Sequence, residues 1–290
     1  MKQSKAYMTV VHIFLILWTA ICILPLLMVL SVSFTDELTF INEGFSFIPK
    51  KFSLAAWKAA LSGGSSLIRA TILTIVTALI GPFLSNALSM MIAYPMSRPD
   101  FAFKKPLTFF YMLPMFISGG MVSSYILIMN WLHLGDNVLL YILPSTGFYA
   151  IVLYRSCFKQ VPASLIEAAT IDGATEYQIL WKVTLPMSRS IFVIQYFMGA
   201  IASWNDYTTS LLYFSKPELF KIQYLIFKML KNAQAVKQAL AITGLDSEVS
   251  TADTTLSYAM CVVAILPVIL VFPLIQKYFA KGVAAGAIKE

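Results

Sequence analysis

The sequence predicts an all-α integral membrane protein, with six transmembrane helices in a single domain that covers residues 1–290. Composition is the first observation behind this prediction. The chain is 59% hydrophobic and only 12% charged, whereas water-soluble domains contain about 45–50% apolar and about 25% charged residues. The second is a set of six apolar stretches close to the length of about 20 residues that a helix needs to cross a bilayer. Lipid is therefore expected to solvate much of this chain.

Each predicted span is an apolar stretch bounded by polar or charged segments. The spans cover residues 8–30, 70–97, 106–132, 137–158, 190–215 and 254–276. Asp206 interrupts the fifth span, and most spans contain Gly or Pro. Since neighbouring helices can satisfy the backbone groups that Gly and Pro free, we expect kinked helices that pack on one another. The first span is longer than the core of a secretory signal and no small-residue cleavage motif follows it, so we expect it to be retained.

The distribution of Lys and Arg predicts the orientation of the spans, because short cytoplasmic loops carry an excess of both residues. With the N-terminus inside, the inner segments hold Lys2, Lys5, Arg98, Lys104, Lys105, Arg155, Lys159, Lys182, Arg189, Lys277, Lys281 and Lys289. Most outer lysines lie in two long loops, 31–66 and 216–253, which count little in this rule. Both termini are therefore predicted to be cytoplasmic. The net charge of +7 then reflects topology, and no nucleic-acid partner is expected.

Cysteine and histidine show no spacing that indicates a metal site or a disulfide. Cys22, Cys157 and Cys261 lie in three separate apolar stretches, where they are predicted to pack as small hydrophobic residues. His12 and His133 have no partner at a metal-ligand spacing. The sequence therefore predicts no bound metal.

The segment between the fourth and fifth spans carries the most informative local pattern. Pro162 fits the first turn of a helix, and Gly173 fits its left-handed end. Thr175 and Gln178 stand at capping-box spacing, so a second short helix should begin there and end at Pro186. We therefore predict a helical hairpin on the cytoplasmic face. From periodicity alone, an ordinary amphipathic surface hairpin explains the pattern equally well.

The same segment also matches a spaced motif. Its defined positions are Glu167-Ala168-Ala169, Gly173, Val183 and Leu185-Pro186. This pattern resembles the EAA signature of permease subunits in bacterial ABC importers, with Val183 standing where Ile is commoner. The likeness covers essentially the whole chain and is strongest to the carbohydrate-uptake branch, the MalG-like and LplC/YtcP-like permeases. The segments 204–206 and 281–289 also look like that branch, although Glu290 stands where Gly is common.

The resemblance implies a type I ABC importer (MetI-like) permease fold with six spans, in the bacterial plasma (inner) membrane. It also implies three kinds of partner: a second permease subunit that forms a heterodimer with this chain, two ATPase subunits and an extracytoplasmic solute-binding protein. By that likeness the coupling loop, 159–189, holds the ATPases through its part 161–186. The tail from Lys281 would reach between the ATPases, and the outer loop 216–253 would meet the binding protein.

The resemblance also gives roles to individual residues of the coupling loop. Glu167 and Asp172 would make polar contacts with an ATPase. Ala168, Ala169 and Gly173 would allow close packing. Leu185 and Pro186 would form the hinge back to the membrane.

The chain has no Gly-x-x-x-x-Gly-Lys-Ser/Thr phosphate loop, so we expect it to hold neither ATP nor another cofactor. ATP and Mg²⁺ would bind to the partner ATPases, and this chain would be a transport subunit without catalytic residues. The resemblance favours a sugar or oligosaccharide as cargo. A non-sugar solute such as glycerol phosphate or a peptide remains an alternative. An integral-membrane enzyme or an ion-coupled carrier fits less well, because a carrier would need several buried ionisable residues.

Polar and aromatic residues within or beside the spans form a candidate substrate path. Asp206 should face the bundle interior, a water-filled path or a helix end, since a charge in the membrane is costly. For the other residues, interhelical hydrogen bonds and packing are the favoured explanation. The candidate residues are Asn86, Tyr125, Trp204, Asn205, Asp206 and Tyr207.

Overall fold

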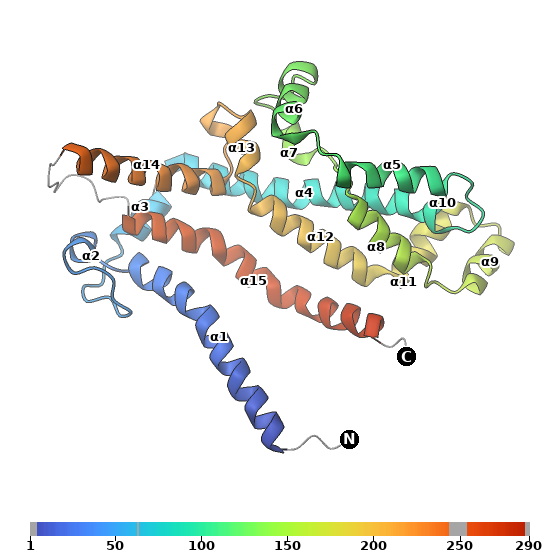
Figure 1. Ribbon diagram of the computed structural model, residues 1–290, viewed down its shortest axis with the longest axis horizontal. Coiled ribbons are helices and arrows are strands. Elements are labelled where there is room, and N and C mark those ends of the chain that lie inside the picture. The colour runs from blue at the N-terminus through green and yellow to red at the C-terminus, as the bar shows by residue number, and fades with distance from the viewer. Residues whose placement is uncertain (1–4, 63, 244–253, 288–290) are drawn as a thin grey trace. The chain divides into compact units, whose positions relative to one another are not determined.

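The computed structural model describes residues 5–62, 64–243 and 254–287. Within these ranges every regular element is a helix, apart from an isolated antiparallel bridge between Thr35 and Phe52 (Figure 1). The chain divides into two compact units. One comprises the residues up to Ile68 together with Leu225–Pro267, and the other comprises Arg69–Tyr224 together with the residues from Val268 onward. The sequence predicts a single domain, and that remains a prediction.

Helices make up most of the described chain. In its N-terminal part they are α1 (Lys5–Ser33), α2 (Glu37–Glu43), α3 (Ala55–Ser62) and α4 (Gly64–Ser97). The central part of the chain forms α5 (Lys104–Phe116), α6 (Gly120–Ile126), the π-helix η1 (Leu127–Trp131), α7 (Leu139–Ile142) and α8 (Phe148–Phe158). After these come α9 (Ala163–Ile171), α10 (Glu176–Ile179), the π-helix η2 (Leu180–Thr184), α11 (Leu185–Met187), α12 (Arg189–Trp204), α13 (Thr208–Tyr213), the 3₁₀-helix η3 (Pro217–Leu219), α14 (Ile222–Thr243) and α15 (Thr254–Ala287).

Polar contacts at the start of α2 join separate parts of the first unit. Glu37, the first residue of α2, accepts hydrogen bonds from the backbone N–H of Thr255 at 2.9 Å and from its hydroxyl. Lys51 lies 3.2 Å from the carboxylate of Asp36 and donates a hydrogen bond to it, which lowers the pKa of that carboxyl. The start of α15 and the segment after α1 therefore fold as one unit.

Three helices are long and apolar enough to cross a membrane: Tyr7–Ser33, Ser66–Ser97 and Thr254–Pro273. They fall on the predicted spans 8–30, 70–97 and 254–276. The prolines within α1 and α4 do not end these helices, as expected where packing satisfies the freed backbone groups. Six spans remain a prediction, since by length and composition the described residues give three spans, or up to five if each bent pair of helices counts as one.

The other three predicted spans are interrupted. Lys104–Phe116 and Gly120–Trp131 are bent by 112° at a break where Gly120 has a φ of +76°, a conformation that glycine adopts at little cost. Pro144 lies in the break between α7 and α8, and residues 205–207 separate α12 from α13. The sequence therefore located the apolar stretches, and the backbone breaks divide three of them into shorter helices.

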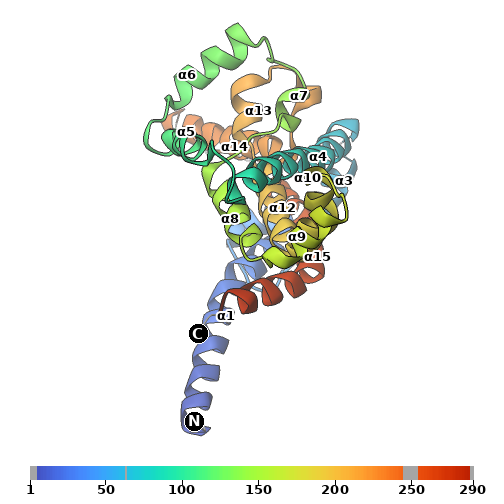
Figure 2. The same ribbon diagram turned by 90° about the vertical axis from the view of Figure 1, so that its right-hand side faces the viewer.

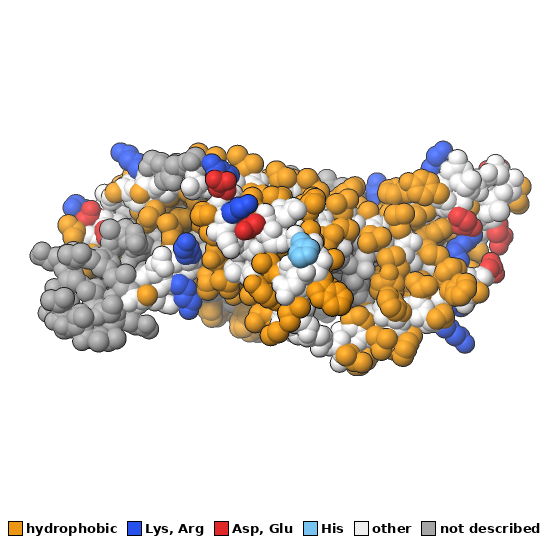
Figure 3. Space-filling model, turned by 90° about the horizontal axis from the view of Figure 1, so that it is seen from above, with side chains coloured by type: hydrophobic (Ala, Val, Ile, Leu, Met, Phe, Trp, Pro, Cys, Tyr) orange, Lys and Arg blue, Asp and Glu red, His pale blue; other side chains and the backbone are white. Residues whose placement is uncertain are grey.

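In the second unit, α4 packs along α8 and α12, and α9 and α10 lie beside the C-terminal end of α4 (Figures 1 and 2). A hydrophobic core joins α4, α8, α10 and η2. Its buried residues are Met90, Ala93, Tyr94, Met96, Ile151, Tyr154, Phe158, Ile179 and Leu180. In Figure 3 hydrophobic side chains cover much of the visible surface, and acidic and basic side chains lie together at the end formed by α9 and α10 as well as in the other half of the view.

Gly81 marks the closest approach of α4 to α7. A Cβ atom at this position would lie 2.7 Å from the backbone carbonyl oxygen of Tyr141, and a backbone atom cannot move away as a flexible side chain can. We expect Gly81→Ala to destabilise the protein by about 1–3 kcal/mol through overpacking, measured as a lower melting temperature in detergent. Gly119→Ala is the matched control, because its Cβ would meet only the side chain of Ser123, at an ordinary 3.5 Å or more. Equal melting temperatures for the two variants would contradict the prediction.

Candidate functional site

The break between α12 and α13 places a carboxylate inside the second unit. After α12 ends at Trp204, Asp206 Oδ1 accepts a hydrogen bond of 3.0 Å from the backbone N–H of Thr209. Thr209 lies in the first turn of α13, whose first N–H groups have no partner within the helix. Asp206 therefore stabilises the start of α13 through one oxygen, and its second oxygen remains available.

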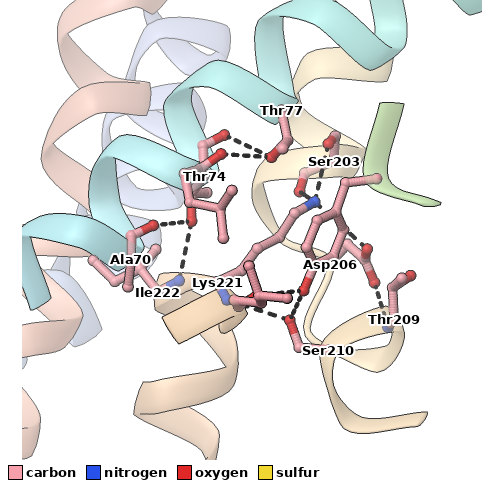
Figure 4. Close-up of polar contacts among 12 residues, drawn as sticks. Ala70, Thr74, Thr77, Ser203, Asp206, Thr209, Ser210, Lys221 and Ile222 are labelled. Carbon is pink, nitrogen blue, oxygen red and sulfur yellow. Dashed lines mark hydrogen bonds and ion pairs between the residues drawn. The ribbon is translucent and has the colours of Figure 1, made fainter. Parts of the chain in front are cut away.

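Lys221 supplies the opposite charge. Its side chain is 1% exposed, and Nζ lies 3.6 Å from Asp206 Oδ2. Nζ also donates to the backbone oxygen of Ser203 at 3.0 Å and to its hydroxyl at 3.3 Å, as Figure 4 shows. The ammonium lies 4.4 Å from the centre of the Tyr141 ring, within the range of a cation–π contact. The protein itself therefore supplies the contacts of this ammonium group.

The backbone around Lys221 is held by hydroxyl groups from other helices. Thr74 of α4 accepts a hydrogen bond of 3.0 Å from the backbone N–H of Ile222. Ser210 accepts one of 3.3 Å from the backbone N–H of Lys221, and its hydroxyl shares a hydrogen bond of 2.7 Å with Tyr141. Figure 4 shows these contacts converging from α4, α12 and α13. The ion pair thus lies in a hydrogen-bonded frame.

The two charges of this site compensate one another. Burial lowers the pKa of the Lys221 ammonium, and the Asp206 carboxylate opposes that effect by favouring the charged form. A buried cation with no such partner would be strongly disfavoured. The Asp206–Lys221 pair therefore contributes little net charge to the cavity beside it.

That space is a polar cavity of about 510 Å³, within the range of small-molecule sites. Hydroxyl and amide side chains from α4, α12 and the segment before α8 line much of it. The lining residues are Gly81, Pro82, Ser85, Asn86, Ser89, Leu140, Tyr141, Leu143, Ser145, Gly147, Ala150, Gln195, Met198, Gly199, Ala202, Ser203, Asp206, Thr209 and Lys221.

Two amides of the lining differ in their contacts. Asn86 donates to the backbone oxygen of Phe192 at 3.0 Å and accepts a hydrogen bond from the hydroxyl of Tyr154. Gln195 has a buried Nε2 with no hydrogen-bond partner among the described residues. Because an unpaired buried donor costs free energy, Gln195 is the lining group most in need of a ligand or a water molecule.

The structure brings together two of the six predicted substrate-path residues, Asn86 and Asp206, at this cavity. The other four do not line it. Trp204 is buried, Asn205 accepts a 3.4 Å hydrogen bond from Gln223, Tyr125 stacks on Tyr213 at 5.9 Å, and Tyr207 is 39% exposed.

Lys221 is the residue that sequence reasoning missed. By position it belongs to the lysines of the predicted outer loop 216–253, whereas its side chain is buried against Asp206. Its immediate neighbours in the sequence, Phe220 and Ile222, are apolar. The available signal in the sequence was a lysine between apolar residues, shortly after the predicted span 190–215 with its single acidic residue, Asp206.

The predicted hairpin forms a second candidate site. Helix α9 ends at Ile171, and Gly173 follows with a φ of +76°, which confirms the left-handed position. Thr175 and Gln178 form the predicted capping box, with hydrogen bonds of 3.3 and 2.9 Å. Pro162 is the N-cap of α9 and not part of its first turn, so that detail was wrong by one residue.

Helix α9 presents two different faces. Ile166 and Ala169 pack against the core of the second unit. Glu167 and Ala168 are exposed, and Ile171 is 86% exposed. Of the two alanines predicted to allow close packing with a partner, Ala169 thus faces the chain's own core and Ala168 faces outward.

The remaining hairpin residues of the prediction divide in the same way. Asp172, Gly173 and Pro186 are exposed. Leu185 packs against the core. The exposed set therefore combines an acidic pair, an alanine, an isoleucine and a glycine turn.

Glu176 fixes the second arm of the hairpin to α4. Its two carboxylate oxygens accept a hydrogen bond of 2.5 Å from the hydroxyl of Tyr94 and one of 3.0 Å from Arg98. Arg98 also lies 5.9 Å from the centre of the Tyr94 ring. Sequence reasoning did not identify these contacts. Glu176 lies 82 positions after Tyr94 and 78 positions after Arg98 in the sequence.

The second helix ends one residue after Pro186, where the sequence predicts its end. The helix continues from α10 through η2 and α11, and it ends at Met187 with Ser188 as its C-cap. The wider π-helical turn of η2 directly precedes the proline, which is the second residue of α11. The next helix, α12, then starts at an angle of 84° to this one.

Two predicted contact regions fall partly outside the described residues. These are the tail from Lys281, of which residues 288–290 are not described, and the outer loop 216–253, of which residues 244–253 are not described. The backbone of 281–287 belongs to α15.

Comparison with known proteins gives a consistent result. Residues 70–285 match the family model for binding-protein-dependent transport system inner membrane components. The chain is 30% identical to the polygalacturonan/rhamnogalacturonan transport system permease protein YtcP of Bacillus subtilis (strain 168), over 99% of both chains. It is 25% identical to the trehalose/maltose transport system permease protein MalG of Thermococcus litoralis (strain ATCC 51850 / DSM 5473 / JCM 8560 / NS-C), over 94% of both.

A solved structure is similar over nearly the same length. The crystal structure of a bacterial ABC transporter involved in the import of the acidic polysaccharide alginate includes a chain that matches with a TM-score of 0.82. The identity is 25%, and the match covers 96% of this chain and 99% of that one.

Proposed function

The chain belongs to the family of binding-protein-dependent transport system inner membrane components, the permease subunits of ABC importers, and on that premise we propose that it carries a sugar or oligosaccharide. It is a transport subunit of the inner membrane with the all-helical MetI-like permease fold, and not an enzyme. The family works with ATPase and solute-binding protein subunits.

The polar cavity is the observation that carries the proposed cargo. Its lining combines hydroxyl and amide groups with one ion pair, Asp206 and Lys221, whose charges compensate each other. Such a surface suits the hydroxyl groups of a saccharide, which both donate and accept hydrogen bonds. The relatives named for polygalacturonan, for maltose and for alginate transport carbohydrates, which supports the same class of cargo.

The proposed mechanism takes its energy from partner subunits. Two ATPases would hydrolyse ATP with Mg²⁺ and bind the exposed face of the 161–186 hairpin, where Glu167, Ala168 and Asp172 lie. The core contacts of Ile166 and Ala169, with the Glu176 contact to Arg98, would pass hairpin movement to α4 and α8. Rigid movement of packed helices is a known route to alternating access.

The remaining parts of the proposal concern topology and assembly. The chain would cross the membrane six times with both termini in the cytoplasm. It would form a heterodimer with a second permease subunit, and its outer loop 216–253 would meet the solute-binding protein. A non-sugar solute is the alternative cargo, because the hairpin motif identifies the transport machine and not what it carries.

Reconstitution tests the proposal directly. The chain is assembled in liposomes with its second permease, its ATPases and its binding protein, and uptake of labelled oligosaccharides is measured with and without ATP. We expect ATP-dependent accumulation of a saccharide, and none when the ATPase carries a disabled phosphate loop. Accumulation of glycerol phosphate or a peptide, with no saccharide transported, would reject the sugar assignment and leave the permease assignment in place.

A further inference from the structure

A small basic pocket lies at the ends of α4 and α8, away from the polar cavity. Its volume is about 190 Å³, which is below the range of about 300–1,000 Å³ typical of sites for drug-sized ligands. Four of its seven lining residues are cationic. The lining is Met96, Ser97, Arg98, Pro99, Lys104, Arg155 and Lys159.

The positive charge of this pocket is only partly compensated. Arg98 forms an ion pair with Glu176 at 3.0 Å, and Lys104 donates to the backbone oxygen of Pro99 at 2.9 Å. Among the described residues, Arg155 and Lys159 form no ion pair within 4.0 Å, and no acidic residue lines the pocket. Like charges brought together without a counter-ion repel one another, so the pocket favours an anion.

Arg155 gives an independent indication of a ligand. Its Nε is buried and has no hydrogen-bond partner among the described residues. Arg155 lies in the last turn of α8, where the helix dipole favours a cation. That position explains the charge, but it does not supply an acceptor for the buried N–H, which is costly to leave unpaired.

The usual excess of Lys and Arg in cytoplasmic loops explains part of the pattern. It accounts for basic residues near the ends of spans, including Lys105 and Lys182, which do not line this pocket. It does not require that Lys104, at the start of α5, lies at the same pocket as Arg155 and Lys159, at the end of α8. The convergence is therefore a feature of the tertiary structure.

We propose that this pocket binds a phosphate group, held by Arg155, Lys159 and Lys104. Arginine donors suit the oxygens of a phosphate in both charge and geometry, and the pocket volume fits a small anionic group. Two sources carry this chemistry: the headgroup of an anionic phospholipid in the inner leaflet, which basic pockets between transmembrane helices can bind, and free phosphate from solution. The site is separate from the polar cavity and independent of the cargo.

Phosphate bound at this pocket would also act on the hairpin. Lys159 lies between the end of α8 and α9, and Arg98 carries the ion pair to Glu176. Bound anion would reduce repulsion among the cations at the base of the hairpin. Transport would then depend on the phospholipid or phosphate that occupies the pocket.

The test uses the assembled transporter in nanodiscs. Phosphatidylglycerol is titrated into phosphatidylcholine nanodiscs, and lipid retained on the protein is measured by native mass spectrometry. Since each cation near an anionic headgroup contributes to binding, we expect Arg155→Gln and Lys159→Gln each to weaken retention about fivefold. Lys105→Gln, next to Lys104 in the sequence but outside the pocket, is the matched control and should retain lipid as the parent chain does. Lys159 is exposed, so its variant tests the pocket without disturbing packing.

Two further arms identify the source of the phosphate. In the first arm, inorganic phosphate is added to nanodiscs of phosphatidylcholine alone, and the melting temperature is measured. If phosphate raises the melting temperature of the parent chain but not of Arg155→Gln, and lipid is not selectively retained, the ligand is free phosphate. Oleate replaces phosphatidylglycerol in the second arm, and equal retention would overturn the proposal, because surface charge alone would suffice. Unchanged lipid retention in both Arg155→Gln and Lys159→Gln would also overturn the proposal. If these variants lose ATPase co-purification while lipid binding stays intact, the proposal is overturned as well, because the pocket would then bind an acidic partner protein.

Discussion

Gly173→Val is expected to lower ATP-driven uptake at least tenfold and to reduce recovery of the ATPase with the membrane subunits. The residue has a φ of +76°, which costs an L-amino acid with a Cβ roughly 1–2 kcal/mol and is worst for a β-branched side chain. A Cβ at this position would meet nothing within 4 Å in the chain itself. Any effect therefore comes from the turn or from a partner, and not from an internal clash. The measurements are uptake in liposomes and ATPase co-purification.

Asparagine at the same position separates these two causes. Gly173→Asn should keep the turn, because asparagine tolerates the left-handed conformation better than other residues. If it restores uptake, the glycine acts through the backbone; if it does not, a partner surface approaches Gly173 closely. Glu167→Ala should also reduce ATPase recovery, whereas Ser164→Ala, an exposed change on the same helix, should not. Normal uptake by Gly173→Val would remove the hairpin from the coupling mechanism.

Asp206→Asn is expected to destabilise the transporter by about 3 kcal/mol, because it leaves the buried ammonium of Lys221 without a counter-ion. The change keeps the size of the side chain and an oxygen that can accept from Thr209. Its effect should appear as a lower melting temperature of the assembled transporter in detergent. Uptake should fall with it, since both residues line the polar cavity.

Removing both charges should recover much of that loss. In the double variant Asp206→Asn with Lys221→Met neither charge of the pair remains, so the cost of an unpaired buried ammonium is removed. Asp100→Asn, at an exposed acidic residue with no ion pair among the described residues, is the matched control. A double variant as unstable as Asp206→Asn alone would show that the ion pair is not the cause.

Local sequence patterns predicted the parts of this fold that depend on nearby residues. Apolar stretches became the long helices of spans 8–30, 70–97 and 254–276, because burial in lipid depends on the composition of one continuous segment. The hairpin turn at Gly173 and the capping box at Thr175 formed as predicted, since both are satisfied by residues within the same few positions. The second helix ends at Met187, one residue beyond the predicted end at Pro186.

Long-range packing decided what those patterns could not. Lys221 pairs with Asp206, and Ile222 pairs with Thr74 across 148 positions. Both contacts depend on how the start of α14 meets α4 and the break between α12 and α13. The same holds for Glu176 with Arg98 and for the cations around Arg155. A sequence shows which charges a chain contains, but the cost of burying each one depends on its spatial neighbours. The sequence alone therefore determined the membrane class, the family motif and the hairpin, while the tertiary structure decided which charges are paired and where an anion would be bound.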